Sequence, residues 1–173
     1  MDIMEAIYTR RTVHEFTAES VDGAAVQAPS AVNRQPWSFV VVQDKALLAR
    51  ISREAKAHLL RTSPAGLVSH HFEDLLSNQD SGIFYHAPAL IVISTMTDSP
   101  WAVDDGSLAA QNLMLAARAA GSGTWWVGFA KAWLGTPEVK AALNLPAAYV
   151  PIAPIIVGHP KSAPPPVPSH AGQ

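Results

Sequence analysis

The chain has 173 residues, with 12 Lys and Arg against 14 Asp and Glu, so its formal net charge is −2. That length suits one domain, and a hydrophobic content of 49% excludes a wholly disordered chain. The near-neutral charge argues against a nucleic-acid-binding module, which needs clustered Lys and Arg. The lack of cysteine excludes disulfides, thiolate zinc sites and cysteine nucleophiles, and it fits the reducing cytoplasm that we expect as the location.

No targeting or membrane-spanning segment is expected. The charges at the N-terminus follow the apolar residues, which is the reverse of a secretory signal. The longest apolar stretches, 87–95 and 108–120, are shorter than the roughly 20 residues that a membrane helix needs. We therefore expect no membrane partner.

The first half of the chain predicts a short helix, a loop, a strand and a longer helix. Residues 2–9 favour a helix, and the poorly periodic, proline-punctuated stretch 17–36 favours a loop. Residues 38–42 are β-branched and aromatic, which is typical of a strand. Asp44 is placed to cap a helix that runs to about residue 61 with one apolar stripe.

The second half begins with a mixed polar loop at 62–82, followed by a continuous apolar run at 89–95 that predicts a buried strand. A helix starting at Asp104 or Asp105 is expected to last to residue 120, with Gly121 just beyond its end. This helix is apolar nearly all round, so we expect it to be covered on every side.

The remaining elements are a strand, a helix and a last strand. The expected ranges are 124–127, 137–143 and 149–157. Pro151 and Pro154 predict an edge position or bulges in the last strand. The mixed order of short strands and helices predicts an α+β fold, with one domain over 1–159 and an extended, proline-rich tail over 160–173. That tail either packs on a neighbouring subunit or is a loose end.

Common catalytic signatures such as G-x-S-x-G, H-E-x-x-H and the phosphate-binding loop are missing from the sequence. The first candidate segment is instead Arg10-Arg11-Thr12, followed by His14. Two arginines and a hydroxyl next to an extended stretch suit a phosphate, although cations are also favoured at a helix C-terminus.

Two further segments are candidates for ligand contact. A proline-stiffened loop carries Ser30, Asn33 and Gln35. Their polar groups either hydrogen-bond the edge of a polar ring or bond to one another in a self-bonded turn, one closed by hydrogen bonds within the loop. Gly128 follows a strand and would let backbone N–H groups approach a ligand. Two adjacent tryptophans, at 125 and 126, point to opposite faces of that strand. Either at least one of them lines a pocket, or both pack into the core.

Together these segments resemble the FMN-dependent nitroreductase family. The resemblance rests on blocks that follow the family's order over most of the chain: R-R-T at 10–12, A-P-S-A-x-N-x-Q-P-W at 28–37, F-Y-x-A-P-A-L-I-V-I at 84–93, L-A-A-Q-N-L-M-L-A-A at 108–117, G-x-G-T-x-W-x-G at 121–128 and I-I-V-G-x-P at 155–160.

The resemblance implies a central, mostly antiparallel sheet flanked by helices, in an intertwined homodimer that binds FMN at its interface. It also implies the activity: a hydride passes from NADH or NADPH to flavin N5, and a nitroaromatic, quinone or similar small molecule accepts the electrons. It implies no metal and no side-chain acid or base.

By matching position, the resemblance assigns the phosphate and ribityl chain to Arg10, Arg11 and Thr12. Lys161 would be a second phosphate cation, and His14 would lie close to the ring.

The resemblance also assigns residues to the flavin ring. Pro29, Ser30 and Ala31 would lie along one side of the ring, with Asn33 from the same loop. The backbone of 127–128, Val127 and Gly128, would face N5 and O4.

Several positions depart from the family pattern. His14 stands where Arg or Lys is usual, the segment 17–27 is short, the tail after Lys161 lacks a basic cluster, and His86 replaces a small residue. These departures leave two alternatives: a dimer of the same fold, with or without flavin, that has no turnover, or a relative with other flavin chemistry such as dehalogenation or flavin breakdown.

Overall fold

A computed structural model describes residues 6, 16–17, 25–62, 82–97 and 99–162. The strands of its sheet are β1 (Phe16–Thr17), β2 (Trp37–Val42), β3 (Ala89–Met96), β4 (Gly123–Trp126) and β5 (Tyr149–Pro160). The α-helices are α2 (Lys45–Thr62), α4 (Ala102–Ala119), α5 (Lys131–Leu134) and α6 (Pro137–Ala142). Three 3₁₀ turns complete the described elements: η1 (Ala25–Gln27), η2 (Ala31–Asn33) and η3 (Gly128–Ala130).

The sheet is antiparallel throughout and has β5 near its centre. One edge of β5 pairs with β3, which in turn pairs with β2. β5 also pairs with β4, at 155–158, and with β1, at 159–160. The expected α+β fold with a mostly antiparallel sheet is confirmed, whereas the edge position predicted for the last strand is wrong.

β5 contains the predicted bulge, next to Pro151. Ile93 pairs with Ala153 and Ser94 pairs with Pro151, so Ile152 is the extra residue on β5. A bulge tolerates the missing N–H of a nearby proline and re-aims a side chain. Here Ile152 approaches α4 so closely that a Cβ at Gly106 would lie 2.9 Å from its Cγ2 atom.

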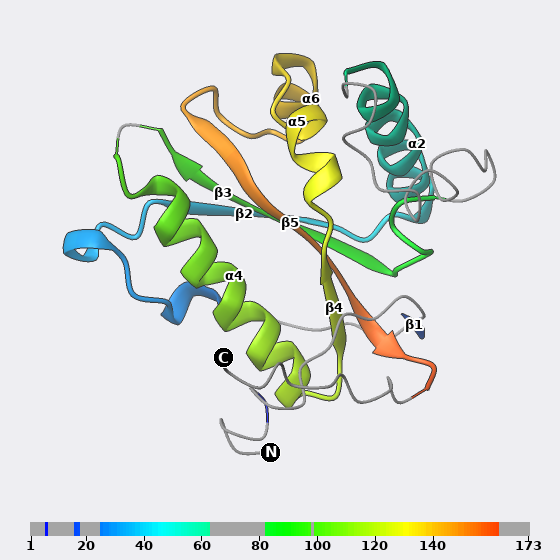
Figure 1. Ribbon diagram of the computed structural model, residues 1–173, viewed down its shortest axis with the longest axis horizontal. Helices are drawn as coiled ribbons and strands as arrows, with labels where there is room; N and C mark the ends of the chain where they lie inside the picture. Colours follow the sequence, from blue (N-terminus) through cyan, green and yellow to red (C-terminus); the bar gives the residue numbers. More distant parts are fainter. Residues whose placement is uncertain (1–5, 7–15, 18–24, 63–81, 98, 163–173) are drawn as a thin grey trace, which may run out of the picture.

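Helices cover the two faces of the sheet (Figure 1). On one face, α4 packs over alternate residues of β3 and β5, among them Ile93 and Ile155, together with η1. On the other face, α2, η3 and α5 pack over Leu90, Val92 and Ile156. The continuous apolar run in β3 is explained by this double burial.

The two long helices follow their sequence signals at most ends. Asp44 accepts a hydrogen bond from the Leu47 N–H at 2.7 Å and caps α2 as predicted. Gly121 has φ +81 just beyond α4, which confirms it as the residue that ends this helix. The start of α4 was predicted too late, because the helix begins at Ala102.

The expectation that α4 is covered on every side is wrong for the single chain. Val103 is 54% exposed and Leu108 is 44% exposed, on the face of α4 that points away from the sheet. Burial of that face requires something outside the described chain.

Several expectations lie wholly or mostly outside the described residues: the helix at 2–9, the loop at 62–82 and the tail beyond residue 162. The described helices include none that combines the length and the apolar character needed to cross a membrane.

Candidate functional site

The loop between η1 and β2 has an unusual backbone. Val32, Asn33 and Gln35 have φ values of +48, +56 and +49. Residues other than glycine rarely adopt this left-handed region, and a β-branched valine does so least readily. Such strain costs of the order of 1–3 kcal/mol per residue and tends to cluster at functional sites. The loop is therefore built for a specific conformation at the expense of stability.

Hydrogen bonds within the loop maintain this conformation. Ser30 accepts the Asn33 N–H at its carbonyl at 3.0 Å and the Gln35 N–H at its Oγ at 2.9 Å. The Arg34 N–H donates to the Ala31 carbonyl at 3.1 Å. The self-bonded turn, which the sequence left as an alternative, is thus present, and it leaves Val32 90% exposed at the tip.

One contact ties this loop to the body of the fold. The Ala31 N–H donates to Asp105 Oδ1 at 2.8 Å, across 74 residues of sequence. Asp105 lies in the first turn of α4 and is only 3% exposed. The sequence predicted only that Asp104 or Asp105 starts this helix, and nothing in it indicated the long-range contact.

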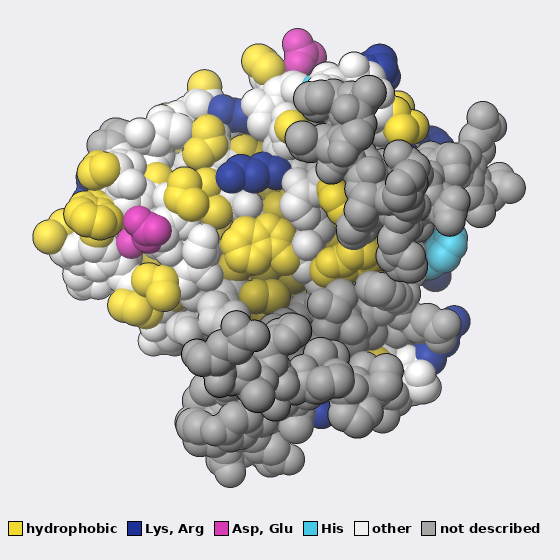
Figure 2. Space-filling view, viewed as in Figure 1, with side chains coloured by type: hydrophobic (Ala, Val, Ile, Leu, Met, Phe, Trp, Pro, Cys, Tyr) yellow, Lys and Arg dark blue, Asp and Glu magenta, His cyan; other side chains and the backbone are white. Residues whose placement is uncertain are grey.

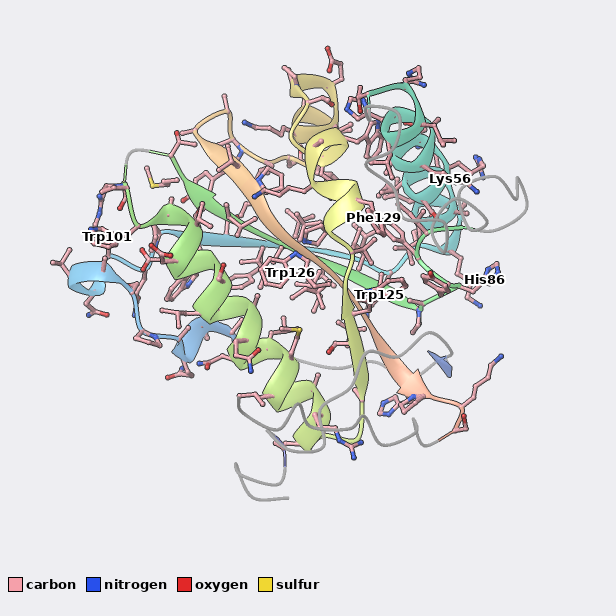
Figure 3. All side chains as sticks on the ribbon, viewed as in Figure 1. Lys56, His86, Trp101, Trp125, Trp126 and Phe129 are labelled. Atoms are coloured by element: carbon pink, nitrogen blue, oxygen red, sulfur yellow. The ribbon has the colours of Figure 1, made fainter. Side chains whose placement is uncertain are left out.

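The second candidate segment joins β4 to η3. Trp125 packs against the core under α2, and Trp126 packs against the core under α4, so the two rings lie on opposite faces as predicted. Figure 3 places Phe129 on the same side of the chain as Trp125. Both tryptophans are partly buried, so packing accounts for much of their surface.

Backbone groups at the end of β4 differ in their availability. The Val127 N–H donates to the Pro154 carbonyl at 2.8 Å, and the Val127 carbonyl accepts from the Ala130 N–H at 3.1 Å. At Gly128, by contrast, a Cβ would meet no described atom within 4 Å. Open space beside a glycine backbone suits the close approach of a ligand.

Tyr85 borders this segment and was not singled out from the sequence. Its ring lies 4.5 Å from that of Trp125, centroid to centroid, at an interplanar angle of 44°. Burial raises the pKa of Tyr85 above its ordinary value of 10.0. Tyr85 and His86 also have positive φ values, +49 and +56, which mark a second tight turn just before β3.

The predicted phosphate-binding residues Arg10, Arg11, Thr12 and His14 lie outside the described residues. The structure nevertheless fixes the strand that follows them, because Phe16 of β1 pairs with Pro160. Lys161 comes directly after that pair and is exposed.

A single chain does not gather the described site residues. The N-terminal end of α4 lies beside Trp101 and beside the loop that carries Pro29, Ser30, Ala31 and Asn33 (Figure 3). Val127 and Gly128 follow β4 beside the middle of β5, where the Val127 N–H bonds Pro154, and from there the chain passes to the face of the sheet that α2 covers (Figure 1). Within the described ranges, no three His, Asp or Glu side chains meet as metal ligands.

Comparison with known proteins identifies the fold and the family. The model of the nitroreductase family matches residues 7–159. The chain belongs to the nitroreductase family.

The relatives span most of the chain. A protein from Archaeoglobus fulgidus, provisionally named NADH dehydrogenase/NAD(P)H nitroreductase, is 29% identical over 92% of this chain and 86% of its own length. An iodotyrosine deiodinase from Haliscomenobacter hydrossis is 34% identical, over 47% of this chain and 39% of its own length. Among solved structures, a nitroreductase with bound FMN from Desulfitobacterium hafniense superposes with a TM-score of 0.80. It is 26% identical and covers 98% of this chain and 95% of its own.

These comparisons bear out the family resemblance and the fold. They support an oxidoreductase in general terms.

Proposed function

We propose that this nitroreductase-family chain binds FMN and transfers a hydride from NADH or NADPH to a nitroaromatic, quinone or similar small acceptor. The observation that carries the proposal is the strained, exposed loop at 28–35, which coincides with the family block assigned to the flavin ring. The bound FMN in the Desulfitobacterium relative supports the cofactor, and the name of the Archaeoglobus relative supports the reduced nicotinamide. We also propose a cytoplasmic location, on the cysteine-free composition.

The residues of this chain fit FMN in two respects. Space is open beside the backbone of Gly128, where a flat ring edge would approach. The loop at 28–35 presents Ser30 and Asn33 on a preset turn, and both carry groups that hydrogen-bond a polar ring. When bound, FMN would supply the redox chemistry, by accepting a hydride at N5 and passing the electrons on to the small acceptor.

We assign the phosphate of FMN to Arg10, Arg11, Thr12 and Lys161. Chain connectivity supports this grouping, because Thr12 is four residues from Phe16 and four residues span at most about 14 Å. Phe16 pairs with the residue before Lys161. In the proposed site, cations from the two ends of the chain would share the phosphate, and charge-assisted bonds to phosphate are strong.

We propose that the active unit is a homodimer. Because loop 28–35 and Gly128 lie apart in one chain, a ring held by both would need the loop of one protomer and Gly128 of the other. The exposed apolar residues Val103 and Leu108 of α4 then face the partner. In this arrangement the protein positions both reactants and excludes water.

Reductive dehalogenation is the second candidate, because the Haliscomenobacter deiodinase shares 34% identity over 89 residues. It would use the same cofactor site. Turnover of 3-iodotyrosine, compared with that of a nitroaromatic and a quinone, separates the two activities.

The deciding experiment is an anaerobic absorption spectrum of the purified protein, before and after addition of FMN and then of NADH or NADPH. We expect flavin bands that persist through desalting and bleach with the reduced nicotinamide. Re-oxidation by a nitroaromatic or a quinone would complete the assignment. A protein that takes up no FMN would refute the proposal and favour the turnover-free alternative.

A further inference from the structure

Asp105 combines burial with an incomplete set of hydrogen bonds. Its Oδ1 accepts the Ala31 N–H at 2.8 Å, while its Oδ2 has no hydrogen-bond partner among the described residues. A buried carboxylate oxygen without a partner is costly, so a residue that keeps one calls for an explanation. A capping role alone is a weak explanation, since exposed Asp104 in the same turn already complements the helix dipole.

The loop that Asp105 contacts needs an external support. Its other hydrogen bonds described above join loop atoms to one another, from Ser30 and Ala31 to Asn33, Arg34 and Gln35. Such bonds shape a turn but do not anchor it to the rest of the fold. The bond from Ala31 to Asp105, by contrast, reaches the rigid end of α4.

We infer that Asp105 is a positioning residue for the cofactor, which holds loop 28–35 in its strained conformation by accepting the Ala31 N–H. The inference rests on the proposed function, because that function assigns the loop to the flavin. Asp105 touches no reacting atom in this account. It holds the turn in its final conformation before FMN binds. The entropy cost of ordering the loop therefore does not weaken FMN binding.

The first test measures FMN affinity of the apoprotein by fluorescence titration, in Asp105→Ala, Asp105→Asn and Asp104→Ala. Asp105→Ala removes the acceptor, so we expect a dissociation constant raised about tenfold or more, as for loss of a hydrogen bond to a charged group. Asp105→Asn keeps a carbonyl oxygen for the Ala31 N–H and should stay within about threefold of the wild type. Asp104→Ala removes an exposed charge from the same helix turn and is the matched control.

These variants separate positioning from charge. Equal losses in Asp105→Ala and Asp105→Asn would overturn the inference, because the charge rather than the acceptor would then matter. Equal behaviour of Asp105→Ala and Asp104→Ala would also overturn it.

A second test needs no flavin. Amide hydrogen exchange in the apoprotein should show a protected Ala31 N–H in the wild type and in Asp105→Asn. In Asp105→Ala that protection should be lost at Ala31, while Val92 in the core keeps its own. If the wild type binds no FMN, the proposed function fails, and exchange at Ala31 still decides whether Asp105 anchors the loop. Unchanged exchange at Ala31 in Asp105→Ala would overturn the inference.

A third test removes the donor instead of the acceptor. Ala31→Pro deletes the N–H at the first position of η2, where proline fits, after a Ser30 that is already extended at φ −139 and ψ 156. In that background Asp105→Ala should change FMN affinity less than twofold, because the two changes break the same bond. A further tenfold loss would contradict the assignment.

Discussion

At the scale of single residues, the candidate site depends on backbone shape as much as on side chains. Val32 and Asn33 carry positive φ values without being glycine, and Gly128 keeps an open space that any Cβ would narrow. A backbone without a nearby side chain suits a flat polar ligand, because backbone N–H groups can then approach the ligand closely. The following predictions test residues of each kind.

Gly128→Ala and Gly128→Val should weaken FMN binding in order of side-chain size, with about a tenfold higher dissociation constant for valine. Apoprotein stability should change by less than about 0.5 kcal/mol, since a Cβ there meets no described atom. Fluorescence titration and urea denaturation give the two quantities. An unchanged affinity in Gly128→Val would remove Gly128 from the site.

Arg10→Ala should raise the FMN dissociation constant about 10- to 100-fold, the range expected for a hydrogen bond between charged groups worth about 1.5–3 kcal/mol. Arg53→Ala is the matched control, because Arg53 is exposed on α2. The flavin-to-protein absorbance ratio after desalting is the measurement. Full occupancy in Arg10→Ala would contradict the phosphate role.

Tyr85 predicts a pH dependence at the alkaline end. Burial raises its pKa in the folded state above 10.0, so the folded state keeps the phenol proton up to a higher pH than the unfolded chain does. The contribution to stability is therefore complete below pH 10 and is lost as the pH rises through the folded-state pKa. Urea denaturation at pH 8 and pH 11 should show a smaller loss in Tyr85→Phe than in the wild type. Equal losses in both proteins would exclude this role of Tyr85.

At the scale of elements, local sequence signals predicted the bounds of most helices and strands. The predictions that failed depend on contacts between segments far apart in the sequence. The capping Asp44 and the apolar run at 89–95 act within a few residues, so α2 and β3 matched their predictions closely. The central place of β5 depends on β1 and β4, which the sequence does not order in space. The bond from Ala31 to Asp105 joins segments 74 residues apart, so no local pattern signals it.

The contact between α4 and the bulge in β5 predicts a stability effect. Gly106→Ala would bring a Cβ to 2.9 Å from Ile152 Cγ2, so we expect a loss of about 1–3 kcal/mol from overpacking. The urea midpoint at constant m-value measures it. Ile152→Ala in the same chain should relieve part of the strain, and strictly additive losses would show that the two residues do not compete for space.

At the scale of the whole molecule, apolar side chains remain exposed on the side where α4 begins. Trp101, Val103 and Leu108 belong to that surface, as does Val32 at the tip of the strained loop. Figure 2 shows hydrophobic side chains gathered there, over η2 and the N-terminal half of α4. Exposed apolar side chains gathered on one side of a molecule mark a candidate interaction surface. Because Val32 belongs to loop 28–35, the proposed dimer interface would include part of the proposed site.

Leu108→Glu is therefore expected to weaken both the proposed dimer and FMN binding, because a carboxylate in an apolar interface must be desolvated without a partner. Light scattering at micromolar concentration should give a dimer mass for the wild type and a lower mean mass for the variant. Leu60→Glu is the control, since Leu60 is 56% exposed on α2, on the opposite side of the sheet. Loss of FMN affinity in step with loss of the dimer would tie the cofactor to the interface. A monomeric wild type that retains FMN would instead show that one chain forms the whole site.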